Sequence, residues 1–257
     1  MKNNLMTQMI YRIILCCLSG IAVLLTFRWF VCVYVGKEDF MWLGDWVNEW
    51  SSLDWRFIYY YTNISNWFVF AASVIVLNDT VKRVKAGERE GHNRVIKAFK
   101  FMTTVMILVT CLIYIFTLGN PLELSYWRNI YNIFCHMVVP IMFIVDFFLF
   151  DEHKIVKWYY PLLSAIIPLI YVVYVMILGA CIKDFDYPYF FLDVNWKGQG
   201  YGGVVLWVVL FAAVFIGLGY LMWLYDKLVK KDGKYKLDFS REQKEENSEQ
   251  KNQENNG

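Results

Sequence analysis

Long apolar runs separated by short charged stretches form the pattern of this chain. A run of about 20 apolar residues can cross the hydrocarbon core of a bilayer as a helix, which rises about 1.5 Å per residue. Six runs reach that length, at residues 9–35, 57–77, 99–118, 130–150, 158–178 and 204–225. Backbone groups in lipid must bond within their own segment, and the alternating strands of a barrel are absent from the pattern. The sequence therefore predicts an all-α polytopic membrane protein, a bundle of six transmembrane helices.

Composition agrees with this pattern and divides the chain into two parts. Hydrophobic residues make up 58% of the chain and charged residues 19%, which is too apolar for an ordinary soluble domain. The first run lacks a small-residue cleavage site after it, so we expect a retained span rather than a signal peptide. From residue 231 onward Lys, Glu, Gln and Asn dominate. We therefore expect a membrane domain at residues 1–230 and a disordered cytoplasmic tail at residues 231–257.

Lys and Arg are distributed unevenly among the predicted loops. Seven lie within residues 80–100 and eight follow Tyr225, whereas the loops after spans one, three and five together hold five. Basic loops stay in the cytoplasm, so we expect both termini there, in an integral protein of the plasma membrane. Membrane topology and contact with membrane lipid account for the basic clusters, and the net charge of +2 gives no indication of nucleic-acid binding.

The first outer loop contains three tryptophans at a helical spacing. Trp42, Trp46 and Trp50 lie four residues apart and so share one face of a helix. Because indoles prefer the membrane interface, we expect a short helix here that lies on the outer surface of the bilayer.

Polar residues inside the spans are the candidate functional residues, because each is costly in lipid. In the second span, Thr62, Ser65 and Asn66 share one helical face and Asn63 lies beside it. Arg28 lies near the outer end of the first span.

The fourth span adds a histidine at a similar depth. Asn132 lies one turn before His136, and Pro140 one turn after it. Pro140 has no N–H, so in an α-helix the His136 carbonyl loses its partner and a kink is expected. Counted from the ends of the spans at about 1.5 Å per residue, Thr62, His136 and Arg28 all lie roughly 8–10 Å below the outer boundary.

A hydroxyl and an imidazole at one depth can carry out nucleophilic chemistry. His136 can take the proton of Thr62 as its oxygen attacks a carbonyl, and Ser65 is the rival nucleophile. A freed backbone N–H can stabilise the oxyanion, and the candidate side chains for contact with the substrate or oxyanion are Asn66, Arg28, Asn63, Ser65 and Asn132. The alternative is structural, because hydroxyls, Asn and His in membrane helices also bond to their own helix or hold helices together.

These segments resemble a known family. The stretches YYTNISNWFVFAASVIVL, FCHMVVPIMFIVDFFLF and YPYFFLDV (Tyr187 to Val194) are similar to the bacterial Pr-six-Pr integral membrane family, over nearly the whole chain except the tail. That family distantly resembles the androgen-induced membrane protein family of intramembrane threonine hydrolases. The resemblance implies that Thr62, preceded by Tyr60, is the nucleophile, and that His136 with Pro140 supplies the base of a His-x-x-x-Pro motif.

Two functions from different classes follow. The first is an intramembrane lipid-ester hydrolase that opens to the outer leaflet, and the resemblance implies a fatty-acyl ester as substrate. The second is a non-enzymatic membrane protein that binds, senses or transports a lipid or small ligand through the same polar layer. The sequence has no metal-ligand cluster or phosphate-binding loop, so neither function implies a cofactor. Its pattern leaves the oligomeric state open.

The distribution of basic residues makes a prediction about topology. A cysteine in place of Lys85 should resist a membrane-impermeant thiol reagent in intact cells, whereas one in place of Gln199 should react. Permeabilised cells provide the control, in which both positions should react. Labelling of position 85 but not position 199 in intact cells would reverse the orientation and move the polar layer to the inner leaflet.

Overall fold

The computed structural model describes residues 5–26, 58–86, 94–118, 130–151, 153 and 156–229, and in these ranges it contains helices and no strands. In chain order the helices are α1 (Leu5–Thr26), α3 (Tyr61–Ala86), α4 (Arg94–Ile113), η4 (Tyr114–Leu118), α6 (Ile130–Ile133), η5 (Phe134–Val138), α7 (Val139–Phe150), α8 (Tyr160–Leu163), α9 (Ile166–Cys181), η6 (Trp196–Gly198) and α10 (Gly200–Leu228). Within the described ranges six helical segments are long and apolar enough to cross a membrane. The predicted all-α bundle is confirmed, and the chain is an integral membrane protein.

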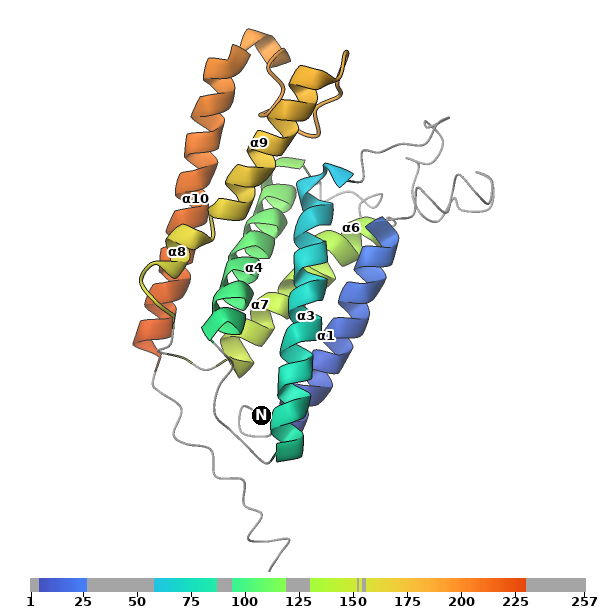
Figure 1. Cartoon of the computed structure of the whole chain (residues 1–257), viewed down its shortest axis with the longest axis vertical. Helices are drawn as coiled ribbons and strands as arrows, with labels where there is room; N and C mark the ends of the chain where they lie inside the picture. The colour runs from blue at the N-terminus through green and yellow to red at the C-terminus, as the bar shows by residue number, and fades with distance from the viewer. Residues whose placement is uncertain are drawn as a thin grey trace, which may run out of the picture.

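Two groups of helices make up the bundle (Figure 1). In the first group α1 packs on α3 and α7, and α4 packs on α3 and α7. In the second, α8 and α10 pack on each other and against α4, while α9 runs beside α10. Figure 1 shows α9 and α10 extending beyond the upper ends of α3 and α4. The segment between α9 and α10 folds back from there toward the start of α3.

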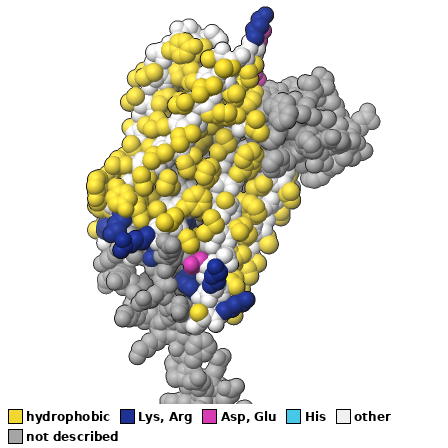
Figure 2. All heavy atoms as spheres, viewed as in Figure 1, with side chains coloured by type: hydrophobic (Ala, Val, Ile, Leu, Met, Phe, Trp, Pro, Cys, Tyr) yellow, Lys and Arg dark blue, Asp and Glu magenta, His cyan; other side chains and the backbone are white. Residues whose placement is uncertain are grey.

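The surface of the bundle is apolar, as a bilayer requires. Figure 2 shows hydrophobic side chains over most of one face, with Lys and Arg gathered mainly at its lower end. Large apolar side chains such as Leu24, Ile170 and Leu206 are exposed on the surface of the bundle. They need no protein partner when the surrounding solvent is lipid.

Two prolines divide the fifth span into α8 and α9. Pro161 lies in the first turn of α8 and Pro168 in the first turn of α9, with a turn at Ser164 and Ala165 between them. Because N–H groups in a first turn have no intrahelical acceptor, the missing donors of these prolines cost little there. Gly219 of α10 allows close packing at this break, since a Cβ atom on it would lie 3.1 Å from the Cα of Pro161.

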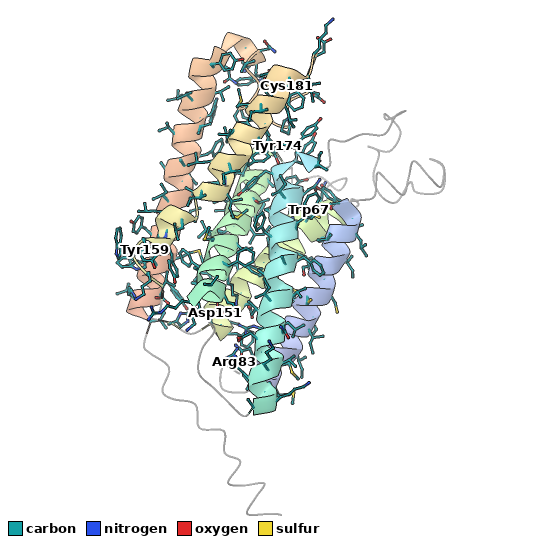
Figure 3. All side chains as sticks on the ribbon, in the orientation of Figure 1. Trp67, Arg83, Asp151, Tyr159, Tyr174 and Cys181 are labelled. Carbon is teal, nitrogen blue, oxygen red and sulfur yellow. The ribbon has the colours of Figure 1, made fainter. Side chains whose placement is uncertain are left out.

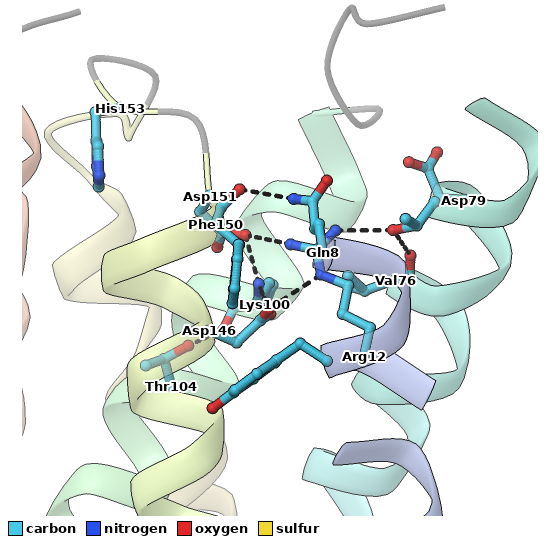
Figure 4. A network of polar contacts seen from close by, with 12 residues as sticks. Gln8, Arg12, Val76, Asp79, Lys100, Thr104, Asp146, Phe150, Asp151 and His153 are labelled. Carbon is cyan, nitrogen blue, oxygen red and sulfur yellow. Dashed lines mark hydrogen bonds and ion pairs between the residues drawn. The ribbon is translucent and has the colours of Figure 1, made fainter. Parts of the chain in front are cut away.

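Buried charges hold α1, α4 and α7 together at one end of the bundle (Figure 4). Arg12 of α1 contacts Asp146 of α7 (Nε to Oδ1, 3.0 Å) and Asp151 (Nη2 to Oδ1, 2.9 Å), and its Nη1 donates to the Thr80 hydroxyl at 2.8 Å. Lys100 of α4 binds both carboxylates. Arg12, Lys100 and Asp146 are at most 2% exposed. We refer to Arg12, Lys100, Asp146 and Asp151 as the charge cluster.

The charge cluster is electrically balanced, with two cations and two carboxylates. An unpaired charge inside a bilayer is costly, so each member depends on the others. The arrangement fixes how α1, α4 and α7 are rotated relative to one another.

A hydrogen bond joins α1 to α3 nearer the other end of the bundle, where the Trp67 indole N–H donates to the Thr26 hydroxyl at 2.8 Å. Figure 3 places Trp67 near one end of this helix pair, and Arg83 and Asp151 near the other.

Some boundaries differ from those predicted. The first helix begins at Leu5 rather than residue 9, and α3 continues to Ala86 rather than residue 77. Charged residues do not end α3 because they find partners along it, as in the Arg83–Asp79 ion pair at 3.0 Å. The predicted outer helix with Trp42, Trp46 and Trp50, Arg28 and the tail at 231–257 lie outside the described residues.

The charge cluster predicts a large effect from removing one cation. Arg12→Met leaves two buried carboxylates with Lys100 as their remaining cation, and breaking a buried ion pair in this way costs about 3–5 kcal/mol. The Tm in detergent, followed by circular dichroism, should fall by about 6 °C or more for a chain of this size. Lys82→Met, which removes an exposed cation from α3, is the control and should change Tm by less than about 2 °C. An Arg12→Met variant as stable as the control would mean that the cluster does not hold the bundle together.

Candidate active site

Thr62 and His136 meet at the end of the bundle opposite the charge cluster. Thr62 lies in the first turn of α3 and His136 in η5, and the Nε2 atom of His136 lies 3.3 Å from the Thr62 Oγ1. Both side chains are buried, at 7% and 3% exposure. With Nε2 as the acceptor, the Thr62 hydroxyl donates its hydrogen to the imidazole. A hydroxyl nucleophile and its base require this arrangement.

His136 lies in a π-helical turn that packs against α3. In η5 the N–H of Val139 donates to the carbonyl of Phe134, five residues back. In that register the missing donor of Pro140 leaves the carbonyl of Cys135, rather than that of His136, without a helical N–H. The expected distortion at Pro140 is thus present as a π turn. The carbonyl that lacks a helical donor lies one residue earlier in the sequence than it would in an α-helix. Such turns are rare and occur often at functional sites.

Asn66 fills the gap that this turn creates. Its Nδ2 donates to the Cys135 carbonyl at 3.0 Å and to the Thr62 carbonyl at 2.8 Å. Both amide hydrogens are therefore engaged with backbone, and Oδ1 is an acceptor that cannot stabilise an oxyanion. In this geometry Asn66 positions η5 against α3 and does not donate to a substrate.

Aromatic rings hold the imidazole of His136 in place. The ring of Tyr114, at the start of η4, stacks on it with centroids 3.4 Å apart and an interplanar angle of 11°. Tyr131 packs against it edge-on at 5.7 Å and 86°. The Tyr131 hydroxyl in turn donates to Oδ1 of Asn63, so that this amide also supports the site from α3. The imidazole is thus confined to one orientation, with Nε2 directed at Thr62.

The remaining predicted site residues occupy different positions. The Ser65 hydroxyl donates to the Thr62 carbonyl at 2.9 Å and accepts from the Thr110 hydroxyl at 3.1 Å, so it is bonded to its own helix and to α4. Asn132 is half-buried, one turn before His136. Arg28 lies outside the described residues.

An apolar cavity adjoins Thr62. It comprises about 720 Å³ of space, part of which is open to the surroundings. Apolar and aromatic side chains of α4, α9 and α10 form most of its wall, and Thr62 and Tyr189 contribute hydroxyl groups. Leu169 belongs to the same wall and is also exposed on α9, so this part of the wall lies at the lipid-facing surface.

Tyr189 is a site residue that sequence reasoning missed. The sequence singled out the stretch from Tyr187 to Val194 only for its resemblance. In the structure the Tyr189 hydroxyl accepts a hydrogen bond from the Thr62 N–H at 3.4 Å. The ring of Tyr189 stacks on Phe191, with centroids 5.0 Å apart and planes 4° apart. Burial raises the pKa of Tyr189 to about 12.

Gln199 holds the segment that carries Tyr189. Its Nε2 donates to the carbonyls of Phe190, at 3.1 Å, and Asp193, at 2.6 Å. Three consecutive aromatic residues, Tyr189 to Phe191, and a nearby Gln were the available signals, but neither indicates by itself that the loop folds back over α3.

No protein-family profile, curated protein or solved structure matches the chain. The fold defines its class as a six-span integral membrane protein. Evidence for a function beyond that class comes from the geometry of the site.

Proposed function

We propose that this protein is an intramembrane hydrolase of lipid esters, with Thr62 as the nucleophile and His136 as the general base. The observation that supports it most is the 3.3 Å contact between Nε2 of His136 and the Thr62 hydroxyl beside an apolar cavity. The sequence resemblance to a family of threonine hydrolases implies the same two residues.

The reaction proceeds in two stages. In the first, Oγ1 of Thr62 attacks the ester carbonyl while His136 Nε2 takes its proton, and the bond to the alcohol breaks as the protonated imidazole returns that proton to the leaving oxygen. The result is an acyl ester on Thr62 and a free alcohol. In the second stage water attacks this ester with His136 again as base, which releases the acid and restores the hydroxyl.

The cavity suits the acyl part of such a substrate. The cavity adjoins Thr62 and most of its wall is apolar, so an acyl chain that enters it lies beside the nucleophile. For a chain that comes from the bilayer, the largely apolar wall replaces its contacts with lipid by equally apolar ones. A substrate dissolved in the bilayer reaches the cavity from the side, at Leu169.

The proposal includes an orientation. The basic residues at the end of α3 and the start of α4 favour a cytoplasmic position for that end. Thr62 and His136 then lie in the outer leaflet of the plasma membrane, with both termini in the cytoplasm, and the sequence resemblance favours a bacterial cell.

A second candidate function is ligand binding without chemistry. Tyr61 lines the cavity, and its buried hydroxyl has no hydrogen-bond partner among the described residues. A buried polar group of this kind is satisfied by the polar part of a ligand. This favours a lipid or small-molecule binding, sensing or transport role if the Thr62–His136 pair is inert.

Labelling with an apolar fluorophosphonate distinguishes the two functions. An activated hydroxyl should react with it, so the purified wild-type protein should be labelled. Thr62→Ala and His136→Ala should each reduce the labelling rate by about 10²-fold or more, and the double variant should add little because one unit is already broken.

Ser65→Ala is the matched control for that experiment, because it removes a hydroxyl from the same face of α3. Its hydroxyl is bonded to its own helix, so labelling should stay within about threefold of wild type. Labelling that is lost in Ser65→Ala but retained in Thr62→Ala would assign the nucleophile to Ser65. Wild-type protein that does not react at all would favour the binding role.

A further inference from the structure

Attack on an ester carbonyl creates an oxyanion that needs hydrogen-bond donors. Removing one such donor typically reduces kcat by about 10²–10³-fold, so a hydrolase of this type requires a defined site for the charge. The Asn66 amide is engaged elsewhere, since it donates to two carbonyls, and Asn63 is not among the described residues that line the cavity. Other groups beside Thr62 are therefore the candidate donors.

The backbone N–H of Thr62 is one available donor. The first N–H groups of a helix have no intrahelical acceptor. At the start of α3 the Tyr60 carbonyl accepts from the N–H groups of Asn63 and Ile64, whereas the N–H of Thr62 is directed at the Tyr189 hydroxyl. The positive end of the dipole of α3 lies at the same point and favours negative charge.

The hydroxyl of Tyr189 is the second donor. It accepts from the Thr62 N–H and also hydrogen-bonds with the Thr62 side chain, so it lies at the reacting hydroxyl, where its own hydrogen can be donated to an oxyanion. Tyr189 is only 9% exposed and lies with Thr62 in the wall of the same cavity. Stacking on Phe191 and edge contact with Tyr60 fix the position of its ring.

The two donor atoms are close enough to bind one oxygen. The Thr62 nitrogen and the Tyr189 oxygen lie 3.4 Å apart. An oxygen atom at about 2.9 Å from each satisfies both, which is the range that oxyanion donors require.

We infer that the Tyr189 hydroxyl and the Thr62 backbone N–H form the oxyanion hole of this site, with Tyr189 as a catalytic residue. This inference rests on the proposed hydrolase function. The nucleophile then supplies one donor from its own backbone, and the segment between α9 and α10 supplies the other. Because burial raises the pKa of Tyr189 to about 12, its hydroxyl remains a donor throughout the usual assay range.

The test compares Tyr189→Phe with wild type in the hydrolysis of p-nitrophenyl decanoate by the full-length protein in detergent. Phe keeps the ring and its stacking on Phe191 and removes only the hydroxyl. We expect kcat to fall by about 10²-fold with KM within about threefold of wild type, because the interaction forms only in the transition state. Incorporation of 3-fluorotyrosine at position 189 keeps the donor and should retain kcat within about threefold.

Tyr160→Phe is the matched control. Tyr160 is also buried, and its hydroxyl donates to the Arg94 carbonyl at 3.4 Å, away from the cavity. Its kcat should equal that of wild type.

The outcomes separate this inference from the proposed function. A Tyr189→Phe variant that keeps wild-type kcat, or that changes only KM, overturns the oxyanion assignment while the hydrolase remains. A fall in kcat in both Tyr189→Phe and the 3-fluorotyrosine protein also overturns it, because the 3-fluorotyrosine protein keeps the O–H donor and should keep kcat. Activity that survives in Thr62→Ala, or is absent from wild type, removes the hydrolase and this inference together.

Discussion

The buried charge cluster is the interaction on which the rest of the bundle depends. Two cations and two carboxylates cancel one another where lipid could solvate none of them. Asp146 lies on α7, and α7 continues directly from η5, which carries His136. Fixing the rotation of α7 against α1 and α4 therefore also limits which way His136 can face. The cluster acts at one end of the bundle and the candidate site lies at the other.

At the site itself, the need to satisfy backbone groups decides the geometry. A proline removes one donor from a π turn, and Asn66 of α3 replaces it with a side-chain amide. The same amide binds the Thr62 carbonyl, so one residue sets the position of η5 relative to the first turn of α3. The hydroxyl–imidazole contact results from these bonds. Polar residues that hold helices together and the pair proposed to react are thus adjacent members of one network.

How much the sequence predicts depends on how local each feature is. Hydropathy is a local property, and all six spans could be predicted, as could the common depth of Thr62 and His136 from counts along two spans. The charge cluster could not, because its bonds join residues up to 139 apart in sequence. The π register at Pro140 depends on a partner from α3, and the position of Tyr189 depends on how a loop folds back. Arg12 and Tyr189 are therefore the residues that required the structure.

The central claim is that Thr62 carries the reactive hydroxyl. It is tested most directly by peptide mass spectrometry of the wild-type protein after reaction with an apolar fluorophosphonate. The account predicts one phosphonate adduct, on the peptide that contains Thr62, with fragment ions that assign it to that side chain. An adduct assigned to Ser65, or to no residue of α3, would contradict the account.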